Sequence, residues 1–149
     1  MRGDIMYSAF DITNYFLIMA DEDSGELLSN MKLQKLLYYA QGTHLTLKGT
    51  PLFSEKILAW VHGPVVSEIY YHYQDYGKTG IPAPEPNVLP EFDDETLEIL
   101  EDVFTVYGQF SAWKLRDLTH EEPPWKQTRN RDEITHQKLK TYFETQVTD

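Results

Sequence analysis

The stretch SNMKLQKLLYYAQGTHLTL, residues 29–47, carries the clearest helical pattern in the chain. Its apolar side chains recur at i, i+3, i+4 and i+7, the spacing of one buried helix face, at Leu33, Leu36, Leu37 and Ala40. Ser29 or Asn30 can supply the N-cap of this helix. Gly42 interrupts the pattern, so the sequence predicts helix up to this glycine and leaves its continuation open.

Further helices are expected on both sides of this one. Residues 8–20 place aromatic and aliphatic side chains at nearly helical spacing, and Gly25 follows the run. Pro123 and Pro124 are expected to stop any helix before them. Three more helices are predicted after cap residues. Asp93 or Asp94 caps the first, whose buried stripe runs from Leu97 to Tyr107; Ser111 caps the second, which runs through Leu118; and Asp132 caps the third, residues 133–147.

Residues 57–61, ILAWV, form a short apolar run bounded by turn-forming residues, which favours a buried strand over a helix. Gly63 and Pro64 follow, and a third helix is expected to begin there because proline suits the first helical position. Residues 79–92 hold four of the eight prolines and are expected to form an extended surface loop. The predicted fold is mainly α, with about six helices and one or a few short strands in one compact domain, residues 1–149.

Composition narrows the classes of function. The net charge is −11, from 24 acidic and 13 basic residues, so the protein would be repelled by phosphates and direct DNA binding is not expected. The same charge keeps the protein soluble and would speed association with a basic protein partner. No long apolar run or signal-peptide pattern is seen and cysteine is absent, so a cytoplasmic protein without a membrane segment is expected.

Catalytic motifs are absent from the sequence. It has no glycine-rich phosphate loop, no Gly-x-Ser-x-Gly, no His-Glu-x-x-His and no cysteine, so no cofactor, metal site or catalytic residue is predicted. The enzymatic alternative uses His62 or His120, the latter followed by Glu121 and Glu122. It is less favoured because no third group is seen to orient the histidine.

Aromatic residues are concentrated in residues 59–77, AWVHGPVVSEIYYHYQDYG. Trp60 and Tyr70 are expected to face inward, whereas other tyrosines fall on different helix faces and suit a protein interface. A base-stacking surface is not favoured, because Lys78 is the only basic residue near these rings. The predicted partner-binding residues, from here and from the polar side of residues 29–47, are Gln34, Tyr38, Tyr39, His62, Tyr71 and Tyr76.

Four segments together resemble the Panacea domain, the SocA-like antitoxin family also described as phage-associated proteins. They occur in that family's order as KLQKLLYYAQG (32–42), GTPLF (49–53), AWVHGPVV (59–66) with Tyr70, and SAWKLRDLTHEEPPW (111–125). The residues in and around these motifs that we expect to be architectural are Leu33, Leu36, Leu37, Trp60, Gly63, Pro64, Tyr70 and Trp125.

The resemblance implies a mainly helical antitoxin that neutralises a cognate protein toxin by direct contact, without a catalytic residue of its own. Members of the family neutralise unrelated toxins, including enzymes that block translation, so the resemblance does not name the toxin. The alternative function is a proteolytic adaptor that delivers a bound partner to an ATP-dependent protease. Whether the chain also forms homo-oligomers stays open at this point.

Overall fold

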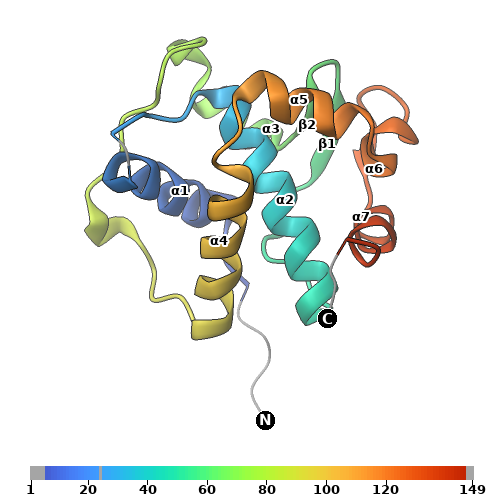
Figure 1. Cartoon of the computed structure of the whole chain (residues 1–149), viewed down its shortest axis with the longest axis horizontal. Helices are drawn as coiled ribbons and strands as arrows, with labels where there is room; N and C mark the ends of the chain where they lie inside the picture. Colours follow the sequence, from blue (N-terminus) through green and yellow to red (C-terminus); the bar gives the residue numbers. More distant parts are fainter. Residues whose placement is uncertain (1–5, 24, 147–149) are drawn as a thin grey trace.

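The computed structural model describes residues 6–23 and 25–146 (Figure 1). Over these residues the prediction of a mainly helical fold with a few short strands is confirmed. Two 3-10 turns, η1 (Gln74–Tyr76) and η2 (Pro86–Val88), accompany the main elements. The α-helices and strands are, in chain order, α1 (Ala9–Asp23), α2 (Asn30–Lys48), β1 (Ile57–Trp60), β2 (Gly63–Val65), α3 (Ser67–His72), α4 (Asp94–Tyr107), α5 (Ala112–His120), α6 (Pro123–Lys126), β3 (Glu133–Ile134) and α7 (His136–Phe143).

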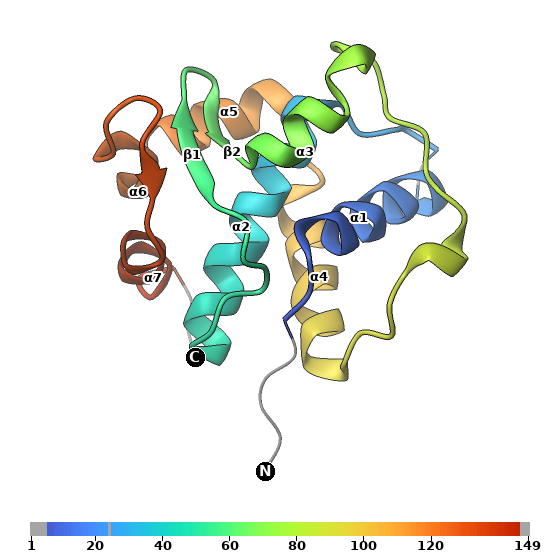
Figure 2. The same ribbon diagram turned by 180° about the vertical axis from the view of Figure 1, so that it is seen from behind.

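Helix α2 lies at the centre of the molecule, with α1 and α4 on one side and α7 on the other (Figures 1 and 2). Its predicted apolar face, Leu33, Leu36 and Leu37, is fully buried. The helix continues beyond Gly42 because this glycine makes room for α7. A Cβ atom at position 42 would lie only 2.2 Å from the Phe143 ring. The helix ends at Gly49, which has the left-handed backbone that glycine adopts without strain.

Three of the predicted helix caps are confirmed. Ser29, Asp93 and Ser111 each accept a hydrogen bond from the backbone N–H three residues later. Helix α5 ends at His120, before Pro123 and Pro124, as expected. Pro123 then occupies the first turn of the short helix α6, where its missing N–H costs nothing.

The prediction for the last helix is wrong at its start. Thr135, rather than Asp132, caps α7, because Glu133 and Ile134 pair with β1 as strand β3. The predicted end of that helix at residue 147 lies outside the described residues.

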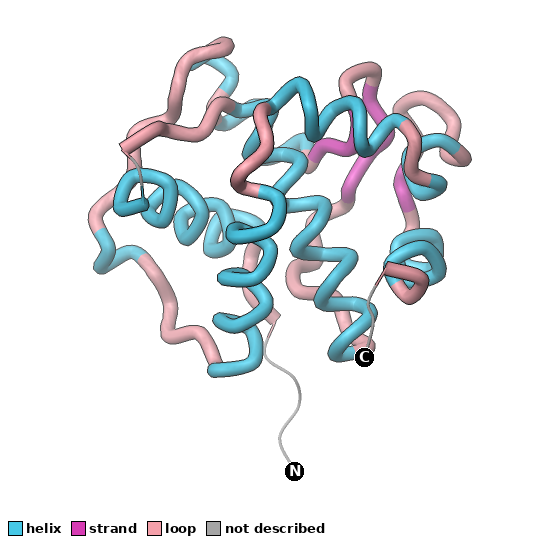
Figure 3. The backbone as a smooth tube through the Cα atoms, in the orientation of Figure 1, coloured by secondary structure: helices cyan, strands magenta, loops and turns pink. Residues whose placement is uncertain are grey.

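The expected third helix at Gly63–Pro64 is also wrong. These residues form strand β2, in which Pro64 pairs with Ala59 and Gly63 pairs with Trp60. The sheet order is β2-β1-β3, so β2 is an edge strand, where proline is tolerated. Helix α3 begins only at Ser67. The resulting hairpin turns at residues 61–62 and lies at the end of the molecule beside α5 (Figure 3).

The proline-rich segment 79–92 passes around α1 before α4 begins (Figure 2). It is anchored by Ile81, whose buried side chain joins the core and whose N–H donates to the Leu28 carbonyl oxygen at 2.8 Å. In the described part of the chain, no helix is both long and apolar enough to cross a membrane.

Candidate partner-binding groove

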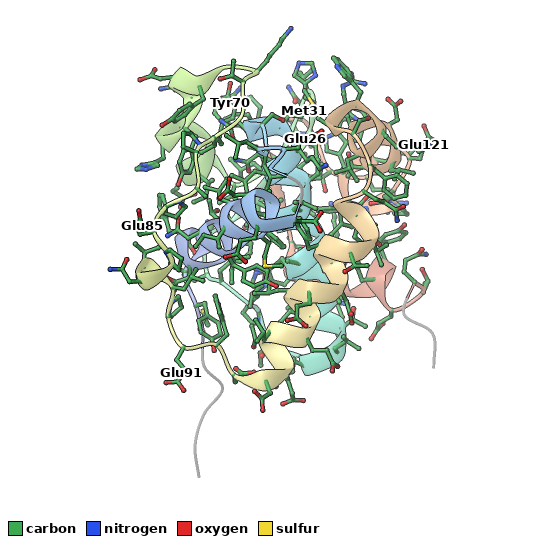
Figure 4. The ribbon with its side chains drawn as sticks, turned by 60° about the vertical axis from the view of Figure 1, so that its left-hand side comes forward. Glu26, Met31, Tyr70, Glu85, Glu91 and Glu121 are labelled. Carbon is green, nitrogen blue, oxygen red and sulfur yellow. The ribbon has the colours of Figure 1, made fainter. Side chains whose placement is uncertain are left out.

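A surface cavity of about 660 Å³ lies between the first turns of α2, the β1–β2 hairpin, the α3–η1 segment, the start of α5 and the residues before β3. We call it the Trp60 groove. Its aromatic and aliphatic lining includes Met31, Trp60, Val61, Tyr70 and Trp113. Figure 4 shows two of these residues, Met31 and Tyr70, at the same end of the molecule.

The rim of the groove exposes large apolar side chains. Val61 in the hairpin turn is 64% exposed, and Trp113 in the first turn of α5 is 57% exposed. Tyr71 is 52% exposed and its ring centroid lies 5.8 Å from that of Trp60. Clustered exposed apolar groups on a folded protein are typical of surfaces that bind another molecule.

Arg116 connects the two sides of this rim. Its Nε donates to Nδ1 of His62 at 3.2 Å, and its guanidinium group lies 5.1 Å from the centre of the Trp113 ring, a cation–π distance. Partial desolvation lowers the pKa of His62, and the positive charges of Arg116 and Lys35 lower it further. His62 is therefore a neutral hydrogen-bond acceptor at pH 7.

His120 and Trp125 hold the hairpin in place from outside the groove. His120 places Nδ1 2.6 Å from the Arg116 carbonyl oxygen and Nε2 2.9 Å from the Val61 carbonyl oxygen. Nε1 of Trp125 donates to the Trp60 carbonyl oxygen at 2.7 Å. Both carbonyl oxygens are acceptors, so a ring nitrogen of His120 makes its bond only when it carries a proton. The contact of Nε2 with Val61 joins α5 to the hairpin, whereas that of Nδ1 with Arg116 lies within α5.

Lys35 lies beneath the hairpin and is only 2% exposed. Its Nζ donates to the Pro64 carbonyl oxygen at 3.3 Å, and its side chain fills the space that a Cβ atom at Gly63 would need. Burial, reinforced by the charge of Arg116, lowers the pKa of Lys35 to about 7. Gly63, with a φ of +115°, is therefore required both by its backbone conformation and by this close contact.

Three of the predicted partner-binding residues are not on the surface. Gln34, Tyr38 and Tyr39 are each at most 2% exposed. The Gln34 side-chain oxygen accepts from the Val66 N–H at 2.7 Å, and the two tyrosine hydroxyls donate to Glu122 at 2.8 and 2.9 Å. Their polar atoms are bonded inside the fold, so Tyr38 and Tyr39 do not present them to a partner in this conformation, whereas Gln34 lines the groove. Contact of these side chains with a partner stays a prediction.

The other three predicted residues are exposed and lie at or near the groove. His62 lines it, Tyr71 packs on Trp60 at the rim, and Tyr76 lies in η1 between the lining residues Gln74 and Gly77. Their role in binding a partner remains a prediction.

Trp113 and Lys35 were not predicted as part of the site. Trp113 lies in a recognised motif, but the residues that make it part of a groove come from α2 and the hairpin. Lys35 lies in the same helix as Lys32, which is only half-buried. No local sequence pattern distinguishes the buried lysine from the half-buried one. Across residues 6–23 and 25–146, no group of three or more histidine, aspartate or glutamate side chains is arranged to hold a metal ion.

Comparisons with known proteins identify the family of this chain. The profile of the family described as "Antitoxin SocA-like, Panacea domain" matches residues 33–126, which run from α2 to α6. The chain belongs to this family. It is 34% identical over 109 residues to "Antitoxin SocA" of Caulobacter vibrioides (strain NA1000 / CB15N), a match that covers 66% of this chain and 58% of that protein. No solved structure matches the chain significantly.

Proposed function

We propose that this protein is an antitoxin that neutralises a cognate protein toxin by direct binding, and that the Trp60 groove is its contact surface. The observation that carries the proposal is the exposure of Val61, Tyr71 and Trp113 around one groove of a chain that belongs to an antitoxin family. Large apolar and aromatic side chains of this kind form the central contacts of protein interfaces.

The construction of the groove supports the same proposal. Its rim comes from elements that are fixed to one another by the Arg116–His62 and Trp125–Trp60 hydrogen bonds. A surface that is held in place before binding loses little conformational entropy when the partner arrives, which favours tight association.

The first test is co-expression of this chain with the product of the neighbouring reading frame. We expect the neighbour alone to stop growth and this chain to restore growth. Growth that is unaffected by the neighbour, or that this chain does not restore, would contradict the proposal. The amount of the neighbour's protein should stay constant during rescue; a fall in its amount would instead favour delivery to a protease.

A further inference from the structure

The charge of the Trp60 groove is opposite to that of the chain as a whole. The chain carries 24 carboxylate residues against 13 basic ones. The lining of the groove nevertheless includes Lys35, Lys78 and Arg131 and contains no aspartate or glutamate. The groove is thus a cationic and aromatic surface on an acidic protein.

These three cations have no carboxylate partner in residues 6–23 and 25–146. Lys35 donates only to the Pro64 carbonyl oxygen, and the guanidinium group of Arg131 lies 5.6 Å from the centre of the Trp60 ring. Lysines elsewhere do form ion pairs, such as Lys48 with Glu95 at 2.7 Å. Other basic residues, such as Lys114 and Lys140, also lack an ion pair among the described residues, so what distinguishes the groove is a lining that holds three cations and no carboxylate.

Asp75 and Asp132, the carboxylates nearest in sequence to the lining, form no ion pair with Lys78 or Arg131 among the described residues. Glu26, labelled in Figure 4, acts on Lys32, and neither residue lines the groove. Glu85 and Glu91 lie farther along the segment 79–92, away from Tyr70 (Figure 4).

Lys35 makes the lack of a counter-charge costly. The ammonium form of Lys35 has lost its hydration without gaining a carboxylate partner, so its pKa falls to about 7, and an anion beside it would favour the protonated form. An anion that entered the groove would interact with Lys35 through a region of low dielectric, where the attraction is stronger than in water. The groove is therefore prepared for a ligand that brings negative charge together with apolar surface.

We propose that the Trp60 groove receives an apolar segment of the partner protein that carries a carboxylate. The carboxylate pairs with the cations Arg131 and Lys78, while the apolar side chains on either side of it cover Trp60 and Trp113. This inference rests on the proposed function for the identity of the partner. A carboxylate would be repelled by most of this acidic surface, so its preference for the groove would set the orientation of the complex.

Two other occupants fit the observations less well. A nucleic acid would bring many phosphates to a chain of net charge −11, and the groove has no glycine-rich loop to hold them. A second copy of the chain would bring a further charge of −11 and so would add repulsion between the two copies.

The test uses three amidated, N-acetylated heptapeptides, Gly-Leu-Phe-Glu-Leu-Phe-Gly and its versions with Gln or Lys at the central position. Each is titrated into the full chain while the NMR signals of the tryptophan indole groups are followed. We expect the Glu peptide to shift the Trp60 and Trp113 signals and to bind about fivefold more tightly than the Gln peptide, with the Lys peptide weakest. Equal affinities, a preference for Lys, or no shift at millimolar peptide would overturn the inference.

Two double variants with the same change in charge locate the effect. Arg131→Gln with Lys78→Gln should reduce the affinity of the Glu peptide to that of the Gln peptide. Lys56→Gln with Lys126→Gln, two exposed lysines outside the lining, should leave the preference intact. An equal loss in both double variants would show a general charge effect and would also overturn the inference.

Two further readings separate the rival explanations. The first is competition by adenosine monophosphate. If it displaced the Glu peptide at a lower concentration than the peptide's own, the groove would be a phosphate site and the carboxylate assignment would be overturned. The peptide titration needs no toxin, so its failure is distinct from a failure of growth rescue. Rescue without a charge preference contradicts only this inference, whereas a charge preference without rescue contradicts only the proposed antitoxin function.

Discussion

The indole nitrogen of Trp125 donates to the backbone carbonyl oxygen of Trp60 at 2.7 Å, which joins α6 to the end of β1. The ring of Trp60 lies 5.1 Å from Tyr70 and 5.8 Å from Tyr71. One hydrogen bond between residues 65 positions apart therefore fixes the strand end that carries the central aromatic residue of the groove.

Replacement of Trp125 by phenylalanine should destabilise the protein. Trp125→Phe keeps an aromatic ring but leaves the Trp60 carbonyl oxygen without its donor, and we expect the free energy of unfolding to fall by about 1–2 kcal/mol in urea. Trp113→Phe is the matched control, since Trp113 is exposed, and should change it by less than about 0.5 kcal/mol. Equal stability of Trp125→Phe and the wild type would show that this bond does not hold the hairpin.

A methyl group at Gly42 should disrupt the packing of α7 on α2. The new Cβ atom would lie within 2.2 Å of the Phe143 ring, so Gly42→Ala should cost about 1–3 kcal/mol even though alanine favours helix more than glycine does. In a Phe143→Ala background the same change should cost much less, since the clash is removed. Additive effects in this double-mutant cycle, measured by thermal unfolding, would rule out the contact as the cause.

Lys35 should make stability depend on pH in the mildly alkaline range. The pKa of Lys35 falls from 10.5 to about 7 on folding, so between these values the unfolded chain holds a proton that the folded chain has released. The free energy of unfolding should therefore rise with pH, by about 2 kcal/mol from pH 7 to pH 9. His62 does not titrate in this window because its pKa is lowered below 6.5, and the tyrosines with shifted pKa titrate above 10.

The control for this effect is Lys35→Met, which keeps the length and apolar volume of the side chain. This variant should lack the rise between pH 7 and 9 and should be more stable than the wild type at pH 7. Parallel stability curves for the two proteins over this range would mean that Lys35 keeps an ordinary pKa in the folded state.

Glu122 should stabilise the contact between α2 and the α5–α6 turn. Glu122→Ala leaves the buried hydroxyls of Tyr38 and Tyr39 without an acceptor, which should cost about 2–4 kcal/mol. Glu122→Gln keeps one acceptor oxygen and should cost less. Glu121→Ala removes only an exposed ion pair with Lys126 and should cost under about 1 kcal/mol. Similar urea midpoints for Glu121→Ala and Glu122→Ala would contradict this role.

The parts of the fold that the sequence predicted depend on local signals. The apolar spacing of Leu33, Leu36 and Leu37 and the caps Asp93 and Ser111 act within one or two helical turns, and all are found as expected. Gly63 and Pro64 were misassigned because their conformation is set by pairing with β1, which no local propensity reports.

The candidate site was predicted only in part, for a similar reason. Tyr38 and Tyr39 looked available for a partner because their acceptor, Glu122, lies more than 80 positions away in the sequence. Tyr71 and Tyr76 were expected to lie off the buried face of their segment, and both are exposed. The cationic lining could not be predicted, since Lys35 and Arg131 come together only through the packing of α2 against the hairpin and the segment before β3.

The most direct measurement of the central claim is calorimetric titration of the purified chain with the product of the neighbouring reading frame. The wild type should bind it in the nanomolar range that is usual for specific complexes. Val61→Asp, at the groove rim, should weaken binding at least tenfold, while Leu47→Asp, an exposed aliphatic residue outside the groove, should leave it unchanged within about twofold. Absence of binding by the wild type, or equal affinities of the two variants, would contradict neutralisation through the Trp60 groove.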